Sequence, residues 1–512
     1  MNKKRLSINL IATLVQFVVS LIISFFFTPF IISSISKEAY GLFAIAGNMI
    51  SYITLLTVAL NSMASRFIGI EWHKENYEKA NEYFNTTFFA NAGISGILMA
   101  ISTIIVIFLN SFLQIPQEIL TDVRILFALV FLSAIITTVM NVFNTPTFCA
   151  NRLDLKSMVT IGTSIVRVIV LGGLFIFFKP NVYYLGISAL VVVLIESAFN
   201  ILFLKKLMSK IKISFKYFRK KYVVELVSSG IWNTVNQLNT ILLTGLDVLI
   251  ANIFLTPALA GVLAISKTIP STIFSLSSTV GGVFLPENLK LYAKDDIEGL
   301  KNQYSYSFNL MGIFTSIVLA GFCVFGMDFY RLWLPNEDFS LIYILSILSM
   351  LSMFSDGNTI TMGNIAVLKN KIKIPILVNL ARAVVGIIIS FLFVKFTDFG
   401  VYAIAGVSSI LGVLFTLLFN VPYCAKLTGF KKSFYYKAQL KFFINVAILI
   451  CVFLGIKMIF PISGWFSLFA LAGISASLAL VVNGFYYLNK NQRKSLISKI
   501  KGKIKHIEKQ NS

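Results

Sequence analysis

Six ionisable residues lie inside long apolar stretches of the sequence, three of them cationic and three acidic. A charged side chain at membrane depth costs ~3 kcal/mol on insertion scales, so each needs a charged partner, water or a polar ligand. Arginine makes bidentate contacts with phosphate and lysine acts as a point charge, so the cations can hold an anionic group. The six residues are Arg167, Glu196, Asp247, Lys267, Asp356 and Arg382.

Lys267 is the first candidate for contact with an anionic ligand, and Arg167 and Arg382 come next. Lys267 has no acidic residue close to it in the sequence and stands three residues before Pro270. A proline inside a helix kinks the helix and frees a backbone carbonyl. We therefore expect a local break in the helix beside Lys267.

The acidic residues allow two interpretations that the sequence leaves open. Arg167 can pair with Glu196, and Asp356 can pair with Arg382, in which case these charges are structural ion pairs. Alternatively, Asp247, Glu196 and Asp356 can carry a proton or a sodium ion, because a buried carboxylate is able to change its protonation state.

The elements that must position these residues are membrane helices. Of the 512 residues 57% are hydrophobic and only 13% are charged, against about 25% charged in soluble domains, which excludes a water-soluble enzyme. The apolar runs are long and continuous, as in helices rather than barrel strands. They predict fourteen transmembrane helices near 7–35, 41–64, 84–109, 124–147, 157–178, 183–205, 227–252, 258–284, 304–328, 340–366, 374–394, 399–422, 441–460 and 464–488.

The net charge of +23 comes from basic residues that are concentrated on one side of the predicted membrane helices, and it does not indicate nucleic acid binding. Of the 44 Lys and Arg residues, 35 fall in the termini and even-numbered connections, and only six fall in the odd-numbered connections. Basic connections stay on the cytoplasmic side, so both termini are expected in the cytoplasm. The basic clusters at 205–221 and 490–509 could also bind anionic headgroups or acidic partners, but topology alone explains them.

The chain contains an internal repeat at an offset of 220 residues. Gly41 matches Gly261, and the loop Lys74-Glu75-Asn76-Tyr77-Glu78 matches Lys294-Asp295-Asp296-Ile297-Glu298. Six helices separate the copies, so both have the same orientation, and the repeat predicts two pseudo-symmetric six-helix lobes. The predicted divisions are lobe 1–210, basic cytoplasmic linker 211–225, lobe 226–430, two further helices in 431–488 and a basic cytoplasmic tail at 489–512.

Both lobes begin with a helix that carries a polar stripe. Such a stripe is too costly to face lipid, so it faces another helix or a hydrophilic cavity. Its occurrence at equivalent positions favours a cavity between the lobes, with Gln16, Asn233 and Gln237 as ligand contacts. The stripe comprises Asn233, Asn236, Gln237, Thr240, Thr244 and Asp247 in one helix and Thr13, Gln16, Ser20 and Ser24 in the other.

Three local runs then resemble a known family over the full length of the chain. EAYGLF at 38–43, FYRLWLPN at 329–336 and DFGVYAIA at 398–405 are similar to the polysaccharide-type flippases of the multidrug/oligosaccharidyl-lipid/polysaccharide (MOP) exporter superfamily. This resemblance implies an all-helical transporter in the bacterial cytoplasmic membrane. It would move a polyprenyl-diphosphate-linked glycan for O-antigen, capsule or another exopolysaccharide to the outer leaflet by alternating access.

In that setting Lys267, Arg167 and Arg382 would contact the pyrophosphate or an acidic sugar. The resemblance implies membrane lipids and a polysaccharide polymerase with its assembly machinery as partners. No resident cofactor or metal is expected, and proton or sodium coupling stays open.

Two alternative functions also stay open: a multidrug/cation antiporter of the same superfamily, usually with twelve helices, and a flippase for the peptidoglycan lipid precursor. A membrane glycosyltransferase is not favoured, because no nucleophile constellation or paired-acid metal site occurs.

Overall fold

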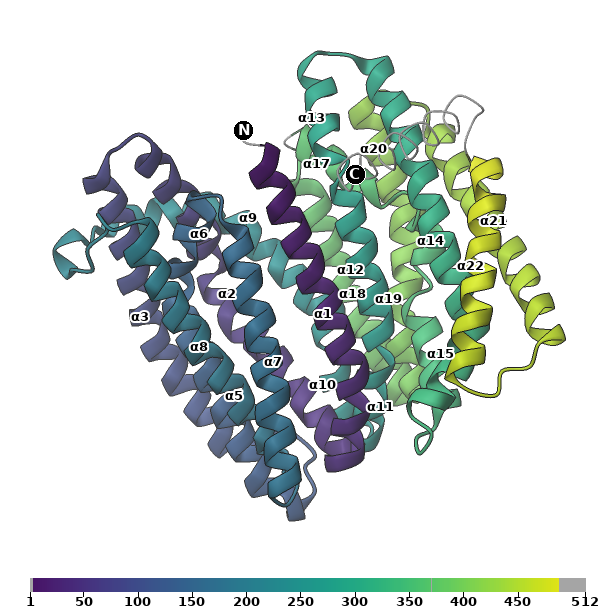
Figure 1. Cartoon of the computed structure of the whole chain (residues 1–512), viewed down its shortest axis with the longest axis horizontal. Helices are drawn as coiled ribbons and strands as arrows, with labels where there is room; N and C mark the ends of the chain where they lie inside the picture. The colour runs from purple at the N-terminus through teal and green to yellow at the C-terminus, as the bar shows by residue number, and fades with distance from the viewer. Residues whose placement is uncertain (1–2, 370, 488–512) are drawn as a thin grey trace, which may run out of the picture. The chain divides into compact units, whose positions relative to one another are not determined.

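The computed structural model describes residues 3–369 and 371–487, and the described part of the chain is helical throughout, without strands (Figure 1). The predicted basic tail at 489–512 lies outside the described residues. The first fifteen elements are α1 (Lys3–Ile35), α2 (Lys37–His73), α3 (Tyr77–Ile107), α4 (Leu109–Phe112), η1 (Gln117–Ile119), α5 (Leu120–Met140), η2 (Asn141–Asn144), α6 (Thr145–Cys149), α7 (Leu153–Phe177), α8 (Tyr183–Leu207), η3 (Phe215–Tyr217), α9 (Lys220–Thr240), η4 (Ile241–Gly245), α10 (Asp247–Phe254) and α11 (Pro257–Ser266).

Two of the predicted spans in the later part of the chain, 340–366 and 399–422, are each divided into several elements in the structure. The later elements are α12 (Thr268–Gly282), α13 (Leu285–Ala293), α14 (Ile297–Trp333), α15 (Phe339–Ser349), α16 (Met353–Asp356), η5 (Ile360–Met362), α17 (Gly363–Leu368), α18 (Lys373–Phe396), α19 (Gly400–Phe415), η6 (Thr416–Asn420), α20 (Val421–Thr428), α21 (Lys432–Ile459) and α22 (Trp465–Tyr487).

The predicted count of fourteen spans is not confirmed. Among the described residues twelve helices are long and apolar enough to cross a membrane, and a thirteenth is added if the bent pair 220–243 and 247–254 counts as one span. The predicted helix 340–366 is divided into α15, α16, η5 and α17, and its longest piece has 11 residues. An apolar run in the sequence does not reveal such breaks, because hydropathy describes the polarity of the side chains and not the conformation of the backbone.

Several helices also continue beyond their predicted ends. The predicted helix 41–64 runs on as α2 to His73, and the predicted helix 304–328 begins seven residues earlier, at Ile297, in α14. Hydropathy ends where charged residues begin, but charged residues are good helix formers, so the backbone stays helical until a capping residue stops it. Lys74 is the C-cap at the end of α2, and Asp296 is the N-cap at the start of α14, where its side chain accepts from the backbone nitrogen of Gly299.

The two loops matched by the 220-residue repeat have the same backbone geometry. Glu75 and Asp295 both adopt positive φ, at 60° and 52°. Asn76 and Asp296 both begin a helix as N-caps, with φ and ψ of −82° and 73° in one loop and −80° and 81° in the other. The repeat seen in the sequence therefore extends to the conformation of individual residues.

The described residues form two compact units. One comprises residues within 1–265 together with 383–404, and the other comprises residues within 266–382 together with those from 405 onward. The two units are defined by contacts within the chain, so their limits do not test the predicted lobes 1–210 and 226–430. Those lobes, their linker and the two appended helices stay a prediction.

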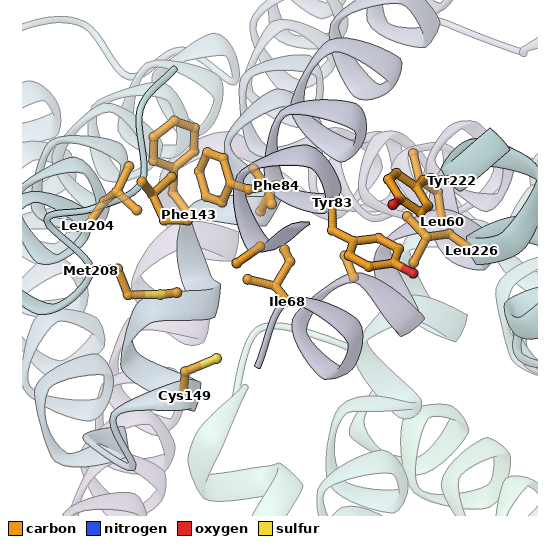
Figure 2. Close-up of a cluster of buried hydrophobic side chains, with 14 residues drawn as sticks. Leu60, Ile68, Tyr83, Phe84, Phe143, Cys149, Leu204, Met208, Tyr222 and Leu226 are labelled. Atoms are coloured by element: carbon orange, nitrogen blue, oxygen red, sulfur yellow. The ribbon is translucent and has the colours of Figure 1, made fainter. Parts of the chain in front are cut away.

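The first unit has a hydrophobic core to which four of its long helices contribute (Figure 2). Helices α2, α3 and α8 contribute to it together with α9, the first helix of the predicted second lobe. Since α8 ends in this core and α9 begins in it, the connection between them is held at both ends. The labelled side chains are Leu60, Ile68, Tyr83, Phe84, Phe143, Cys149, Leu204, Met208, Tyr222 and Leu226.

In the second unit the FYRLWLPN run attaches α14 to the hairpin of α21 and α22. Arg331 donates to the carbonyl oxygen of Ile462 at 3.0 Å and pairs with Asp328 at 3.1 Å. Lys457 of α21 also pairs with Asp328. The Phe329 ring lies edge-on against Trp465, with centroids 5.8 Å apart. These residues therefore hold helices together.

Candidate functional site

The amide side chains predicted to contact a ligand have unused hydrogen-bonding capacity. Gln16 of α1 and Asn233 and Gln237 of α9 are half-buried. None of these side chains makes a hydrogen bond within the described part of the chain. An amide carries two N–H donors and a carbonyl acceptor, and leaving them without partners in a membrane helix is costly. These groups therefore suit water or a polar ligand better than helix-to-helix bonding.

Asp247 lies at a backbone irregularity in the same polar stripe. It is buried, with 6% of its surface exposed, and begins α10 directly after the π-helical segment η4. Tyr52 of α2 donates to the carbonyl oxygen of Gly245 at 2.6 Å and interacts electrostatically with Asp247. Single π-helical turns are frequent at functional sites. Tyr52 belongs to this site although the sequence analysis did not select it.

Arg167 and Glu196 are both half-buried but do not form an ion pair within the described residues. Glu196 accepts a hydrogen bond from the Thr163 hydroxyl at 3.2 Å. Arg167 interacts electrostatically with Tyr40 of α2. The pairing considered from the sequence is therefore not formed, and the guanidinium of Arg167 is not neutralised by Glu196.

The break expected beside Lys267 is present. Helix α11 ends at Ser266 and α12 begins at Thr268, with Lys267 half-buried at the junction. Pro270 has no N–H, so the carbonyl of Ser266, four residues earlier, loses its helical donor. The Ser346 hydroxyl of α15 donates to this carbonyl oxygen at 2.7 Å and shares its proton with the Ile342 carbonyl of its own helix, also at 2.7 Å. The proline thus frees a carbonyl as predicted, and a side chain 80 residues away satisfies it.

Asp356 and Arg382 interact electrostatically without a direct ion pair. The Thr416 hydroxyl donates to Asp356 Oδ2 at 3.4 Å. The Arg382 guanidinium lies 4.9 Å from the centroid of the Phe415 ring, a cation–π contact. Its Nε is buried without a partner, and the side chain donates no hydrogen bond within the described part of the chain.

Arg382 is held in this position by close backbone packing. A Cβ atom added to Gly412 of α19 would lie 3.3 Å from Arg382 Nη1 and 2.9 Å from Ser352 Cβ. The glycine therefore allows the guanidinium to lie against α19, between the Phe415 ring and the broken helix that carries Asp356. A cation fixed in this way with unused donors can bind a phosphate or a carboxylate.

No group of three or more His, Cys, Asp or Glu residues in the described part of the chain has the arrangement needed to hold a metal ion. The candidate residues are divided between the two units: the first contains Gln16, Arg167, Glu196, Asn233, Gln237 and Asp247, and the second contains Lys267, Asp356 and Arg382. Their predicted roles in binding and in ion coupling remain predictions.

Comparison with known proteins adds independent information. Residues 31–337 match the sequence model described as "Polysaccharide biosynthesis protein". The chain is 28% identical over 504 residues to the uncharacterized membrane protein EpsK of Bacillus subtilis (strain 168), covering 97% of this chain and 98% of the relative.

Two solved structures have a similar fold. One is the lipid II flippase MurJ in an inward closed conformation, with a TM-score of 0.65, 14% identity, and coverage of 94% of this chain and 98% of that chain. The other is an inward-facing multidrug resistance MATE family transporter of the MOP superfamily, with a TM-score of 0.62, 14% identity, and coverage of 88% and 98%. The resemblance inferred from the local sequence runs is confirmed.

Proposed function

The chain belongs to the polysaccharide biosynthesis protein family, and on that premise we propose that it is a flippase for a polyprenyl-diphosphate-linked glycan. Family and fold together support a multi-pass membrane transporter or flippase of the MOP superfamily. The glycan is the more specific part of the proposal. It would be the repeat unit of an O-antigen, a capsule or another exopolysaccharide.

The observation that carries this proposal is the unused hydrogen-bonding capacity of Gln16, Asn233 and Gln237 within membrane helices. A sugar headgroup cannot cross ~30 Å of hydrocarbon alone, because its hydroxyls would lose their water partners. Amide groups supply replacement donors and acceptors, while the polyprenyl tail stays in lipid. Rocking between two repeats would expose the site to each side in turn.

The anionic part of the substrate requires cations. Arg382 has donors without partners among the residues that the structure describes, and it therefore suits a pyrophosphate oxygen or an acidic sugar. Arg167 and Lys267 are the further cationic candidates. Transport of this kind forms and breaks no covalent bond, so the proposal includes no enzymatic step.

The proposed location is the bacterial cytoplasmic membrane, with both termini and the basic connections in the cytoplasm. The 35 basic residues on the proposed cytoplasmic side support this orientation. A polysaccharide polymerase and its assembly machinery would receive the flipped substrate. Energy would come from a proton or sodium gradient acting on Asp247, Glu196 or Asp356, or from removal of the product.

The test uses purified full-length protein in vesicles that contain a polyprenyl-diphosphate oligosaccharide with a fluorescent label on the glycan. A membrane-impermeant reductant bleaches only label in the outer leaflet. We expect protein-containing vesicles to lose the protected fluorescence over time and empty vesicles to retain it. Asn233→Leu/Gln237→Leu should slow this loss, because leucine removes the amide groups at similar volume.

Matched vesicles separate the alternatives. Fluorescent lipid II tests the peptidoglycan-precursor function, which similarity to the MurJ fold favours. A fluorescent cationic dye tests the antiporter function, which similarity to the MATE fold favours. Flipping of lipid II alone, or dye transport alone, would overturn the proposed substrate and leave the MOP fold as the common feature.

A further inference from the structure

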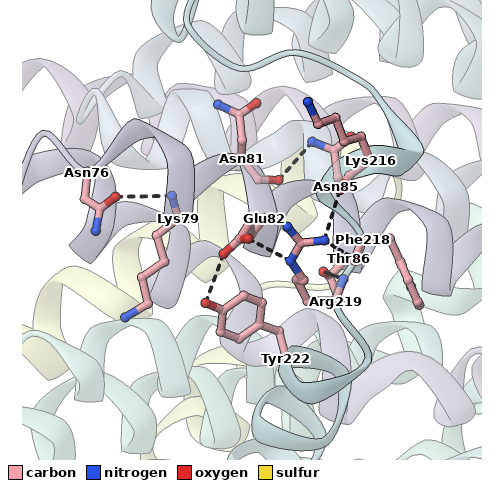
Figure 3. A network of polar contacts seen from close by, with 10 residues as sticks. All are labelled: Asn76, Lys79, Asn81, Glu82, Asn85, Thr86, Lys216, Phe218, Arg219 and Tyr222. Atoms are coloured by element: carbon pink, nitrogen blue, oxygen red, sulfur yellow. Dashed lines mark hydrogen bonds and ion pairs between the residues drawn. The ribbon is translucent and has the colours of Figure 1, made fainter.

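The connection between α8 and α9 is fixed to α3 by two asparagine side chains, and Figure 3 shows the further contacts that Glu82 and Thr86 of α3 make with Arg219 and Tyr222. Asn81 donates to the carbonyl oxygen of Lys210 and accepts from the Lys212 nitrogen, at 3.0 and 2.7 Å. Asn85 donates to the carbonyl oxygen of Lys212 and accepts from the Ser214 nitrogen, both at 2.8 Å. The backbone groups of residues 210–214 are thus paired with side chains of a helix, much as they would be with the backbone of a neighbouring strand.

The spacing of the two asparagines explains why this pairing works. Residues four apart in a helix are separated by ~6 Å along its axis, and residues two apart in a strand by ~6.6 Å. Asn81 and Asn85 therefore match backbone groups two residues apart. Asn81 and Asn85 are 4% and 0% exposed, and each also donates to the carbonyl oxygen four residues earlier. Their amide N–H groups are fully used in holding this backbone.

The following residues are fixed as well. The Arg219 nitrogen donates to the Thr86 hydroxyl oxygen at 3.0 Å, and its guanidinium pairs with Glu82 at 2.8 Å. The same guanidinium donates to the carbonyl oxygen of Lys216 at 3.1 Å. Tyr222 donates to the second oxygen of Glu82 at 3.0 Å. The connection therefore has a defined conformation from Lys210 to Tyr222.

This fixed backbone presents apolar side chains to the outside. Ile213 is 51% exposed and Phe215 is 67% exposed. The Phe215 ring stacks on Phe218 with centroids 5.3 Å apart and meets Phe89 edge-on at 5.1 Å. Leaving these side chains in water is unfavourable, whereas aromatic rings at the headgroup level of a membrane are stabilised.

The lysines of the connection fall into two groups. Lys210 lies 3.8 Å from the centroid of the Tyr77 ring and Lys221 lies 4.8 Å from that of Tyr222. The remaining five are exposed, and none of them has an acidic partner among the residues that the structure describes. These five are Lys205, Lys206, Lys212, Lys216 and Lys220.

We infer that the segment 205–221 is a binding surface for anionic glycerophospholipid headgroups. Lys212 and Lys216 contact lipid phosphates, while Ile213 and Phe215, which lie between them in the sequence, enter the headgroup region. Charge complementarity favours an anionic lipid, and the exposed aromatic ring favours a membrane over a soluble acidic protein. The inference uses the cytoplasmic orientation proposed above and does not depend on the substrate.

The test measures lipid affinity without transport. Purified full-length protein in neutral detergent is titrated with phosphatidylglycerol or phosphatidylcholine, and bound lipid is counted by native mass spectrometry. We expect phosphatidylglycerol to bind more tightly, and its affinity to fall as salt rises. A lysine near an anionic surface contributes about fivefold in affinity, so Lys212→Gln/Lys216→Gln should weaken phosphatidylglycerol binding about 25-fold.

The matched control is Lys431→Gln/Lys432→Gln, which removes the same charge from another exposed basic connection. This control should change phosphatidylglycerol affinity much less. Phe215→Ser should weaken binding with all lysines present. Equal phosphatidylglycerol affinity in the wild type and in Lys212→Gln/Lys216→Gln overturns the inference and makes an acidic protein the better occupant. Normal flipping by that variant would leave the proposed function intact.

Discussion

Gly41 and Gly261, which occupy equivalent positions in the 220-residue repeat, pack directly against each other. A Cβ atom added to Gly41 would lie 2.7 Å from the backbone nitrogen of Gly261 and 2.8 Å from its Cα. In the predicted two-lobe arrangement, the axis relating the repeats would pass close to both residues. This contact explains the glycine at position 41, whereas a Cβ atom at Gly261 would collide with the backbone carbonyl group of Lys37.

Gly41→Ala should destabilise the protein by ~1–3 kcal/mol through overpacking. The measurement is the thermal unfolding of purified protein in detergent. Gly47→Ala is the control in the same helix, because a Cβ at Gly47 meets no atom within 4 Å. Alanine in an open helical position is expected to be neutral or stabilising by up to ~1 kcal/mol. Equal unfolding temperatures for the two variants would show that the close approach is not maintained.

Ser346→Ala should destabilise the junction of α11 and α12. The change removes the donor to the Ser266 carbonyl and leaves the Tyr330 hydroxyl, which lies 2.9 Å from Ser346 Oγ, without that contact. An unsatisfied buried polar group costs ~1–3 kcal/mol. Ser349→Ala is the control, since the Ser349 hydroxyl only donates to the carbonyl of Leu345 in its own helix. Thermal unfolding should separate the two variants, and the same loss in both would argue against a special role for Ser346.

Asn85→Leu should loosen the connection between α8 and α9. The Lys212 carbonyl and the Ser214 nitrogen would lose their partner, at a cost of ~1–3 kcal/mol. Hydrogen exchange of the Ser214 amide should rise strongly, because its proton would no longer be held by a buried acceptor. Thr103→Val, on an exposed face of the same helix, should leave this exchange unchanged. An unchanged exchange rate in Asn85→Leu would contradict the proposed pairing.

The sequence predicted features that depend on neighbouring residues. The matched loops at Glu75 and Asp295 were predictable because a turn and its N-cap are determined within a few residues. The carbonyl freed by Pro270 follows from proline chemistry, but Ser346, which satisfies it, is distant in the chain. The breaks in the predicted helix 340–366 were missed for the same reason. They depend on tertiary packing, which an apolar run does not encode.

The candidate site shows the same division between local and long-range features. The polar stripe identified Gln16, Asn233 and Gln237 because helical spacing is readable from one segment. It did not identify Tyr52, whose hydroxyl contacts the π-helical segment from 193 residues away. The pairing of Arg167 with Glu196, one of the two alternatives that the sequence left open, is not formed within the described residues, because adjacency of helices in sequence does not determine which of their side chains meet.

Arg382→Ala and Lys267→Ala should each abolish glycan display at the cell surface while the protein reaches the membrane at a normal level. Lys395→Ala, at the end of α18, is the control for loss of an exposed cation. Normal display in both variants would reject a role of these two cations in substrate binding. If a carboxylate carries the coupling ion, vesicles with an imposed proton or sodium gradient should flip the substrate, and collapse of that gradient should stop flipping.

A double variant separates a structural role of Arg382 from a role in substrate binding. Removing Arg382 leaves Asp356 without its attractive partner, which destabilises a poorly hydrated carboxylate. Adding Asp356→Asn removes that charge, so Arg382→Ala/Asp356→Asn should unfold at a higher temperature than Arg382→Ala. Flipping should nevertheless stay lost, because the phosphate contact is still missing. Recovery of both stability and flipping would mean that Arg382 only neutralises Asp356.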